Sequence, residues 1–412
     1  MQRWTTPLLA ATALAAAGAA SSADLEVMTQ NQYVGADLIG VVTEPDFNVA
    51  VVELLQTRAA SLPAERAKAL AALIAKRAPA LVGLQEVYAF ECYEIPAVTD
   101  DFLGCEDPSI AGAFTDQLTD TLDALGGNYV EAATVVDLDL PQSLALPPPL
   151  DALPGLPIDV NGTTILLRVV DRDVILARKG VAFQPIDFTQ LQFIDSAICA
   201  LPSADGCNYQ VVAAEDLTLP VPFPPGSLEV TVRFERGFVG VDAMVGDKHY
   251  RFVTTHLETR LEGFGPLGRY YQTAQAYELH GTLEALQDFS PSPGEIVVGD
   301  FNSDPRDLEE VDGIVPPYQI FAVDHTDIWT KRPGASTGKG APLVGFSCCQ
   351  AEDLGNRKSE LYERVDLIFS LAPPMKVQEA RLLGESVSDK TPPIAFGVWP
   401  SDHASVATRL QY

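Results

Sequence analysis

The chain has 412 residues, with 27 Lys and Arg against 56 Asp and Glu, and its formal net charge is −29. This excess of acid repels polyanions at long range, so it disfavours a broad nucleic-acid-binding surface. Hydrophobic residues make up 47% of the chain, which is ample for a buried core.

The first 23 residues have the pattern of a secretory signal peptide. Arg3 gives a positive start, residues 8–17 are apolar and Ala-rich, and small residues precede Asp24. The apolar part is too short for a membrane span, and no later uninterrupted apolar run approaches the roughly 20 residues that a span needs. We expect an exported protein, secreted or periplasmic, that is monomeric and has no transmembrane segment.

Residues 24–412 contain neither an internal repeat nor a convincing linker, so we expect one elaborated domain. Strand-like apolar runs alternate with helical stretches, which indicates layered α and β structure and disfavours an all-helical fold. Proline is concentrated around 141–157 and 220–225. Both stretches are predicted to be loop insertions folded onto the body rather than central strands.

Six cysteines in an exported chain favour disulfides over thiol catalysis. Neighbours in sequence suggest bonds between Cys92 and Cys105 and between Cys199 and Cys207. A bond between the adjacent Cys348 and Cys349 would close a strained ring, so bonding of each to another partner stays open.

In the first half of the chain, polar residues follow predicted strands. Asn31 lies near the end of a strand that starts at Glu26, and Glu86 ends the apolar run 80–87, after a helix predicted over 54–78. Alone, Asn31 is typical of a turn, and a single Glu is typical of a salt bridge. Residues 164–178 are predicted to be a pair of strands that carries Asp173.

Polar residues also follow predicted strands in the second half of the chain. His256 ends a strand over 250–257, a helix is predicted over 268–288, and 295–305 (EIVVGDFNSDP) is a buried strand followed by Asp300 and Asn302. Asp366 lies in a strand over 364–369, and Asp402 and His403 precede the last strand. Each motif alone is as typical of a turn as of a catalytic site.

Together, the ordered motifs MTQN, LQEV, TTHLE, GDFNSDP, RVDLIF and SDHASV resemble the endonuclease/exonuclease/phosphatase superfamily, from Met28 to Val406. This superfamily includes pancreatic-type deoxyribonucleases, abasic-site nucleases, neutral sphingomyelinases and inositol polyphosphate 5-phosphatases. The resemblance implies an α/β four-layered sandwich, in which two mixed β-sheets pack face to face with helices outside. It places the active site at the ends of the sheets.

The resemblance also implies roles for single residues. Glu86 would bind a divalent metal, with Asn31 beside it and Asp402 contributing. Asp300 would orient or deprotonate the attacking water, and Asn302 would hold that water or the phosphate. His256 and His403 would contact phosphate oxygens, and Asp366 would orient His403. Carboxylate and amide oxygens suit Mg²⁺ or Mn²⁺. Asp173 stands where the family often has Asn, so it is held only as a candidate site residue.

The sequence therefore predicts a secreted, metal-dependent phosphoester hydrolase that favours phosphodiesters. The substrate is a phospholipid headgroup, a small ester or a nucleic acid, and the net charge weakly favours a small or lipid-linked phosphodiester over long duplex DNA. Arg172, Arg178, Arg260 and Arg269 could still form a local positive pocket for an extracellular nuclease. The alternative from another class is an exported binding protein that kept the fold and lost catalysis.

Overall fold

The computed structural model describes residues 24–412 except 39, 42–43, 45, 95–103, 145, 149, 194–197, 204–205, 221–226, 261–265, 293, 310–312, 336–343 and 394–396. The predicted signal peptide, residues 1–23, lies outside the described residues. Within them, no helix is long and apolar enough to cross a membrane.

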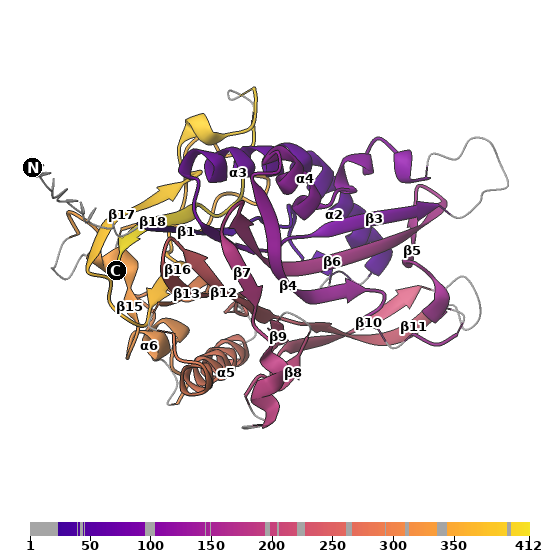
Figure 1. The fold of residues 1–412 in the computed structure, drawn as a ribbon. Helices are drawn as coiled ribbons and strands as arrows, with labels where there is room; N and C mark the ends of the chain where they lie inside the picture. The colour runs from indigo at the N-terminus through magenta and orange to yellow at the C-terminus, as the bar shows by residue number, and fades with distance from the viewer. Residues whose placement is uncertain are drawn as a thin grey trace, which may run out of the picture.

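Two mixed β-sheets form the centre of the molecule (Figure 1). The first sheet has the order β17–β18–β1–β2–β6–β3, and β4 and β5 also pair with β6. It is mixed because β1 runs parallel to β2 and antiparallel to β18. Its strands are β1 (Leu25–Asn31), β2 (Leu81–Gln85), β3 (Ala89–Glu94), β4 (Tyr129–Leu140), β5 (Leu156–Val160), β6 (Thr163–Arg178), β17 (Lys376–Leu383) and β18 (Ser405–Gln411).

The second sheet has the order β15–β16–β14–β13–β12–β9–β8, and β7 also pairs with β12. β14 runs parallel to β13 and antiparallel to β16. Its strands are β7 (Ala182–Pro185), β8 (Leu201–Pro202), β9 (Gly206–Asn208), β12 (Gly237–Val245), β13 (Lys248–His256), β14 (Glu295–Asp300), β15 (Thr326–Asp327) and β16 (Asp366–Ser370). A separate hairpin joins β10 (Ala213–Pro220) to β11 (Ser227–Phe234).

Alternation of side chains along the strands explains how both faces of each sheet are buried. Val27 of β1 and Val298 of β14 belong to the apolar cluster between the sheets. Met28 packs outward with α3 (Pro63–Arg77), and Val297 packs outward with α5 (Leu267–Phe289). The remaining helices are α2 (Phe47–Ala60), α4 (Gln117–Ala124) and α6 (Pro317–Phe321). The predicted four-layered sandwich with external helices is confirmed.

The helix predicted over 54–78 is in fact two helices, α2 and α3. α2 begins earlier, at Phe47, because the Asp46 side chain accepts hydrogen bonds from the Asn48 and Val49 backbone N–H groups. The break falls before Pro63, which is the first residue of α3. Proline disfavours helical geometry at the residue before it, and Leu62 has a left-handed φ of 53°.

The predicted pair of strands over 164–178 is wrong, because β6 is one continuous strand of 16 residues. The polar residues in the middle of β6 do not form a turn, because charged residues outside the strand lie close to Arg172 and Asp171. Arg172 pairs with Asp116 at 2.6 Å, and Asp171 lies 3.9 Å from Arg236. β6 can therefore pair with β2, β3, β4 and β5 along its length.

The two proline-rich stretches lie away from the centre of the sheets. Leu144 and Leu150 are buried, as expected for a loop folded onto the body. The prediction of a loop is wrong for Pro157, because this residue lies in β5. Among the described strands, β5 pairs only with β6. Pro220 ends β10, and residues 221–225 lie outside the described residues.

Three disulfides are present. The predicted bonds Cys92–Cys105 and Cys199–Cys207 are confirmed. The alternative in which Cys348 and Cys349 each bond elsewhere is not seen, because these two residues are joined to each other.

Candidate active site

The candidate catalytic residues lie where strands of both sheets end. In the second sheet, His256 of β13 pairs in register with Asp300 of β14, and Asp300 pairs with Asp366 of β16. The first sheet contributes Asn31 at the end of β1, Glu86 after β2, and Asp402 and His403 before β18. The site is therefore an interface between the two sheets, and neither sheet holds all of its residues.

Gly299 allows the strands that carry His256 and Asp300 to approach closely. Its φ is 147°, and a Cβ atom here would lie 2.0 Å from the Thr255 carbonyl oxygen. A side chain would push β14 away from β13 and separate the imidazole from the carboxylate. The close approach of β13 and β14 therefore explains why the GDFNSDP motif begins with glycine.

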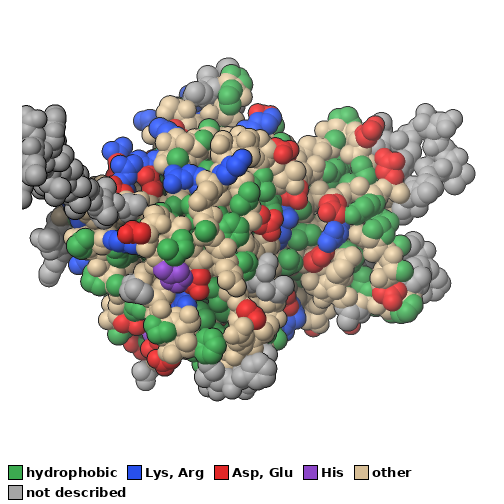
Figure 2. Space-filling model, in the orientation of Figure 1, with side chains coloured by type: hydrophobic (Ala, Val, Ile, Leu, Met, Phe, Trp, Pro, Cys, Tyr) green, Lys and Arg blue, Asp and Glu red, His purple; other side chains and the backbone are tan. Residues whose placement is uncertain are grey.

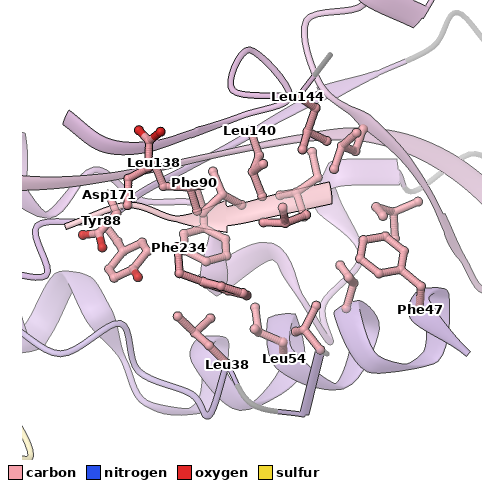
Figure 3. Close-up of a pocket in the computed structure, with 18 of the residues that line it drawn as sticks. Leu38, Phe47, Leu54, Tyr88, Phe90, Leu138, Leu140, Leu144, Asp171 and Phe234 are labelled. Carbon is pink, nitrogen blue, oxygen red and sulfur yellow. The ribbon is translucent and has the colours of Figure 1, made fainter. Parts of the chain in front are cut away.

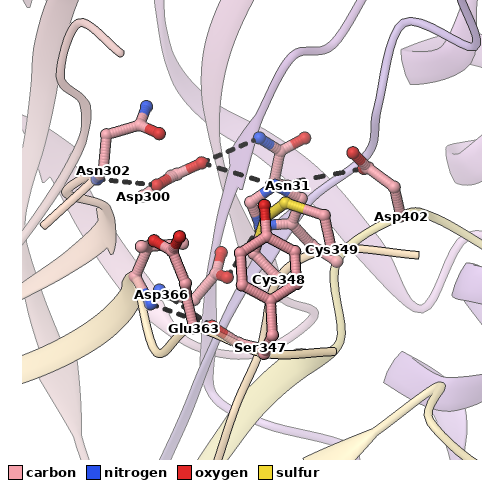
Figure 4. The surroundings of a disulfide bond; sticks show 12 residues. Asn31, Asp300, Asn302, Ser347, Cys348, Cys349, Glu363, Asp366 and Asp402 are labelled. Atoms are coloured by element: carbon pink, nitrogen blue, oxygen red, sulfur yellow. Dashed lines mark hydrogen bonds and ion pairs between the residues drawn. A yellow bond between two sulfur atoms is a disulfide. The ribbon is translucent and has the colours of Figure 1, made fainter. Parts of the chain in front are cut away.

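The Asp300 carboxylate is the centre of the site (Figure 4). Its Oδ1 accepts a hydrogen bond from the Asn302 backbone N–H at 2.8 Å, and its Oδ2 accepts from Asn31 Nδ2 at 3.1 Å. His256 Nε2 and His403 Nε2 lie 3.6 and 3.7 Å from the same Oδ2. Burial raises the pKa of Asp300, which makes it a better proton acceptor than an exposed Asp.

His403 is held in the protonated form by the carboxylates around it. Its Nδ1 lies 2.8 Å from Asp366 Oδ2, and the Asp366 side chain is buried. Burial opposes the charged imidazole, but Asp366, Asp402 and Asp300 outweigh burial and raise its pKa well above the usual value. His403 can therefore present a positively charged N–H donor to an anionic oxygen.

His256 has the opposite character. Burial, Arg236 and His403 all lower its pKa well below the usual value, so the ring is neutral. Arg236 Nη1 lies 3.0 Å from His256 Nδ1 and is the donor of this pair. A neutral ring that accepts at Nδ1 carries its proton on Nε2, which lies toward Asp300. Asn302 Nδ2 is 3.2 Å from that nitrogen, but its hydrogen bond goes to the Leu257 carbonyl oxygen, at 2.8 Å.

Two site residues have backbone conformations that are rare outside glycine. Glu86 has a φ of 53° and Asn302 a φ of 46°. The left-handed turn after β2 brings Glu86 to the cleft, where Oε1 accepts from Asn31 Nδ2 at 3.0 Å and Oε2 accepts from the Val34 N–H at 2.9 Å. Strained backbone of this kind is concentrated at functional sites.

The donors around the cleft fit a hard divalent cation. Glu86 and Asp402 offer carboxylate oxygens, which Mg²⁺ and Mn²⁺ prefer. The Asn31 amide oxygen instead accepts from the Tyr33 N–H, and the amide nitrogen of Asn31 faces Glu86. Burial raises the pKa of Asp402 to about 7, and Glu86 and Asp300 add to this shift by repulsion. A cation would relieve that repulsion. A different group, Asp300, Asp366 and His403, has ligand atoms that all lie within 4.8 Å of one another, but its imidazole suits Mg²⁺ less well.

Asp173 is fully buried on β6 and has no polar contact with the other described site residues. Neither of its carboxylate oxygens has a hydrogen-bond partner within the described part of the chain. Burial, together with Asp171, raises its pKa well above the usual value. Unlike Asp300, Asp173 has no hydrogen bond to another site residue among those that the structure describes, so we assign it no role in the site.

The cleft has a volume of about 560 Å³ and contains residues that the motifs did not indicate. Tyr33, Tyr88, Arg236 and Cys349 all line it. Arg236 is the most informative of these, because it contacts His256. It lies between two strands in the stretch FERGFVG, where a single Arg after one Glu has no periodic signal.

Comparison with known proteins gives structural neighbours only. Neither a protein-family model nor a curated protein matches the chain. A mannosyl-6-phosphatase from Bacteroides thetaiotaomicron shares 14% identity at a TM-score of 0.47, covering 94% of this chain and all (100%) of that one. An endonuclease/exonuclease/phosphatase from Beutenbergia cavernae shares 16% identity at a TM-score of 0.44, covering 94% and 72% of the chains.

The catalytic domain of human Nocturnin with bound sulfate shares 15% identity at a TM-score of 0.44, covering 94% of each chain. These neighbours include a protein described by the family name that the six sequence motifs suggested. At identities and TM-scores this low, the similarity carries no argument about the activity of this chain. Its function has to be argued from its own residues.

Proposed function

We propose that this protein is a metal-dependent phosphoester hydrolase that favours phosphodiesters. The observation that carries the proposal is the position of Asp300, a buried carboxylate that lies between His256 and His403 and is held by two asparagines. A carboxylate beside two N–H donors can accept a proton from water while the donors bind the anionic phosphoryl group.

Each side chain has a task that its environment supports. Asp300, with its raised pKa, accepts the proton of the attacking water. His403, protonated and oriented by Asp366, and His256, neutral with its proton on Nε2, donate hydrogen bonds to phosphoryl oxygens. A cation held by Glu86 and Asp402 would neutralise charge on the phosphate. Mg²⁺ or Mn²⁺ is the cation that this oxygen donor set favours.

The charge around the cleft supports a small or lipid-linked phosphodiester over long duplex DNA. Among the described residues that line it, Arg236 is the one basic side chain, against six acids. These acids are Asp37, Glu86, Glu215, Glu258, Glu352 and Asp402. A long polyanion would be repelled along the cleft beyond the metal.

The four arginines that could have formed a local positive pocket do not line this cleft. Arg172 pairs with Asp116, and Arg260 pairs with Asp307 and Glu363. Basic side chains gather instead over α3 and β17 (Figure 2). There Arg77 pairs with both Glu26 and Glu379. Neutralised arginines on that face offer little attraction to a nucleic acid.

The deciding experiment compares substrates on the purified mature chain with Mg²⁺ or Mn²⁺. Hydrolysis of bis(p-nitrophenyl) phosphate that needs metal and is lost in Asp300→Asn is expected. Equal activity in metal-free protein, or in Asp300→Asn, would end the proposal. Binding of phosphodiesters without turnover would favour the alternative of a non-catalytic binding protein on the same fold.

A parallel comparison of initial rates on plasmid DNA and on sphingomyelin vesicles separates the substrate classes. Rapid plasmid nicking with inert vesicles would make the protein an extracellular nuclease.

Export belongs to the same proposal and is tested by the N-terminus of the mature protein, which we expect near Asp24. Monomeric behaviour is also part of the proposal and is tested by light scattering.

A further inference from the structure

An apolar cavity lies next to the catalytic cleft, between α2 and the strands β3 to β6 and β11 (Figure 3). Its volume is about 110 Å³. Apolar side chains from several elements point into it, among them Phe47, Leu54, Phe90, Leu140, Leu144 and Phe234. An apolar space of this kind is not favourably filled by water, which finds no polar partners there.

The cavity and the cleft are adjacent. Leu38, Tyr88, Phe234 and Arg236 line both spaces. Arg236 stands at the junction, since its Nη1 also contacts His256 Nδ1 at 3.0 Å. One wall of the cavity is therefore formed by the arginine that contacts His256, the histidine that we assign to phosphoryl binding.

Polarity is confined to one end of the cavity. Asp171, Glu235 and Arg236 are its charged lining residues; Arg236 also lines the cleft and lies 3.9 Å from Asp171. Arg236 Nε is buried and has no hydrogen-bond partner among the described residues. A ligand that matches this space has hydrogen-bond acceptors at one end and hydrocarbon at the other.

We propose that the cavity binds the hydrocarbon chain of an amphipathic phosphodiester whose phosphate lies in the cleft. This inference rests on the proposed hydrolase function and names its substrate class. A sugar or a nucleobase would leave polar edges unpaired against the apolar side chains, whereas methylene groups would not. The shared wall at Arg236 sets the order of the ligand, with the phosphate near Arg236 and the chain directed toward α2.

The inference predicts a dependence on chain length. Each methylene removed from water raises affinity about fourfold until the cavity is filled. We would use alkylphosphocholines from ethyl to octyl as probes, below the concentrations at which they aggregate. Hydrolysis is measured with saturating Mg²⁺, and binding is measured by calorimetry after chelation, so that binding is read without turnover.

Filling the cavity should abolish this dependence. Val51 lines the cavity from α2 and is 5% exposed, so Val51→Phe places a ring inside it. Val49, on the same helix, is 44% exposed and does not line the cavity, so Val49→Phe is the matched control. Leu54→Phe is a second filling variant, used if Val51→Phe does not fold. We expect the filling variant to lose the advantage of octyl over ethyl and the control to keep it.

The possible results separate the two proposals. A chain-length gradient in binding that disappears in the filling variant supports the cavity even if none of the probes is hydrolysed, in which case the hydrolase proposal fails alone. Hydrolysis with equal kcat/KM for ethyl and octyl probes overturns the cavity inference and leaves the hydrolase proposal standing. A gradient that persists in both filling variants also overturns it, because the chain would then bind elsewhere.

Discussion

Replacement of Asp366 by Asn tests the most tightly defined contact in the site. Asp366 Oδ2 lies 2.8 Å from His403 Nδ1, and the Asp366 side chain is buried. The change keeps the shape of the side chain and removes its charge. We expect His403 to lose both its fixed orientation and the main source of its raised pKa.

The size of the effect follows from the kind of hydrogen bond that is lost. A hydrogen bond to a charged group contributes about 1.5 to 3 kcal/mol. Because each 1.36 kcal/mol is a factor of ten in rate, kcat should fall by between about 10-fold and about 150-fold. The pKa of His403 should also fall, so its protonated form is lost at lower pH. The alkaline limb of the pH–rate profile should therefore move to lower pH.

Steady-state kinetics on a chromogenic phosphodiester would measure this effect in Asp366→Asn, His403→Ala and the double variant. If Asp366 acts through His403, the double variant should be no slower than His403→Ala alone. Asp247→Asn is the matched control, because Asp247 is exposed in the turn before β13, at the opposite end of that strand from His256. Multiplicative losses, or an unmoved alkaline limb, would show that Asp366 does not act through His403.

Three further predictions use other parts of the structure. Glu86→Gln should raise the Mg²⁺ concentration needed for half-maximal activity by about 10-fold or more, since it removes a charged oxygen ligand, and an unchanged metal titration would place the cation elsewhere. Asp173→Asn should increase thermal stability more at pH 8 than at pH 5. Its folded-state pKa is raised, so the wild-type protein loses up to about 1.4 kcal/mol per pH unit as the pH rises from about 4, and a variant with equal gains at both pH values would contradict the burial argument. Non-reducing peptide mapping should recover Cys92 linked to Cys105, and free thiols at both positions would refute that bond.

The sequence allowed the strand ends to be predicted because each one joins an apolar run to a polar residue. His256 and Asp300 end parallel strands and Asp366 begins an antiparallel one, so the pairing of these strands makes the three residues neighbours in the sheet. The bounds of single elements were predicted wrongly where one residue interrupts a periodic pattern. Pro63, for example, divides the predicted helix into two. The roles of the individual site residues remain predictions, since geometry alone does not measure turnover.

What the sequence did not reveal depends on contacts between distant segments. Arg236 has no motif around it, and its importance comes from Asp171 on β6 and His256 on β13. The apolar cavity was missed for the same reason as Arg236. Its walls come from α2 and several strands whose residues lie far apart in the chain. A periodic pattern in one segment cannot show a space that several segments enclose.

The division of the site between the sheets has a practical consequence for dissecting the protein. Lys179 and Gly180 form an exposed turn after β6, before the chain enters the second sheet. A chain cut there would leave Glu86 on one fragment and both Asp300 and His403 on the other. Neither fragment alone could carry a complete catalytic set. Activity recovered on mixing the fragments would therefore measure how well two half-proteins find each other, with an enzymatic readout of reassembly.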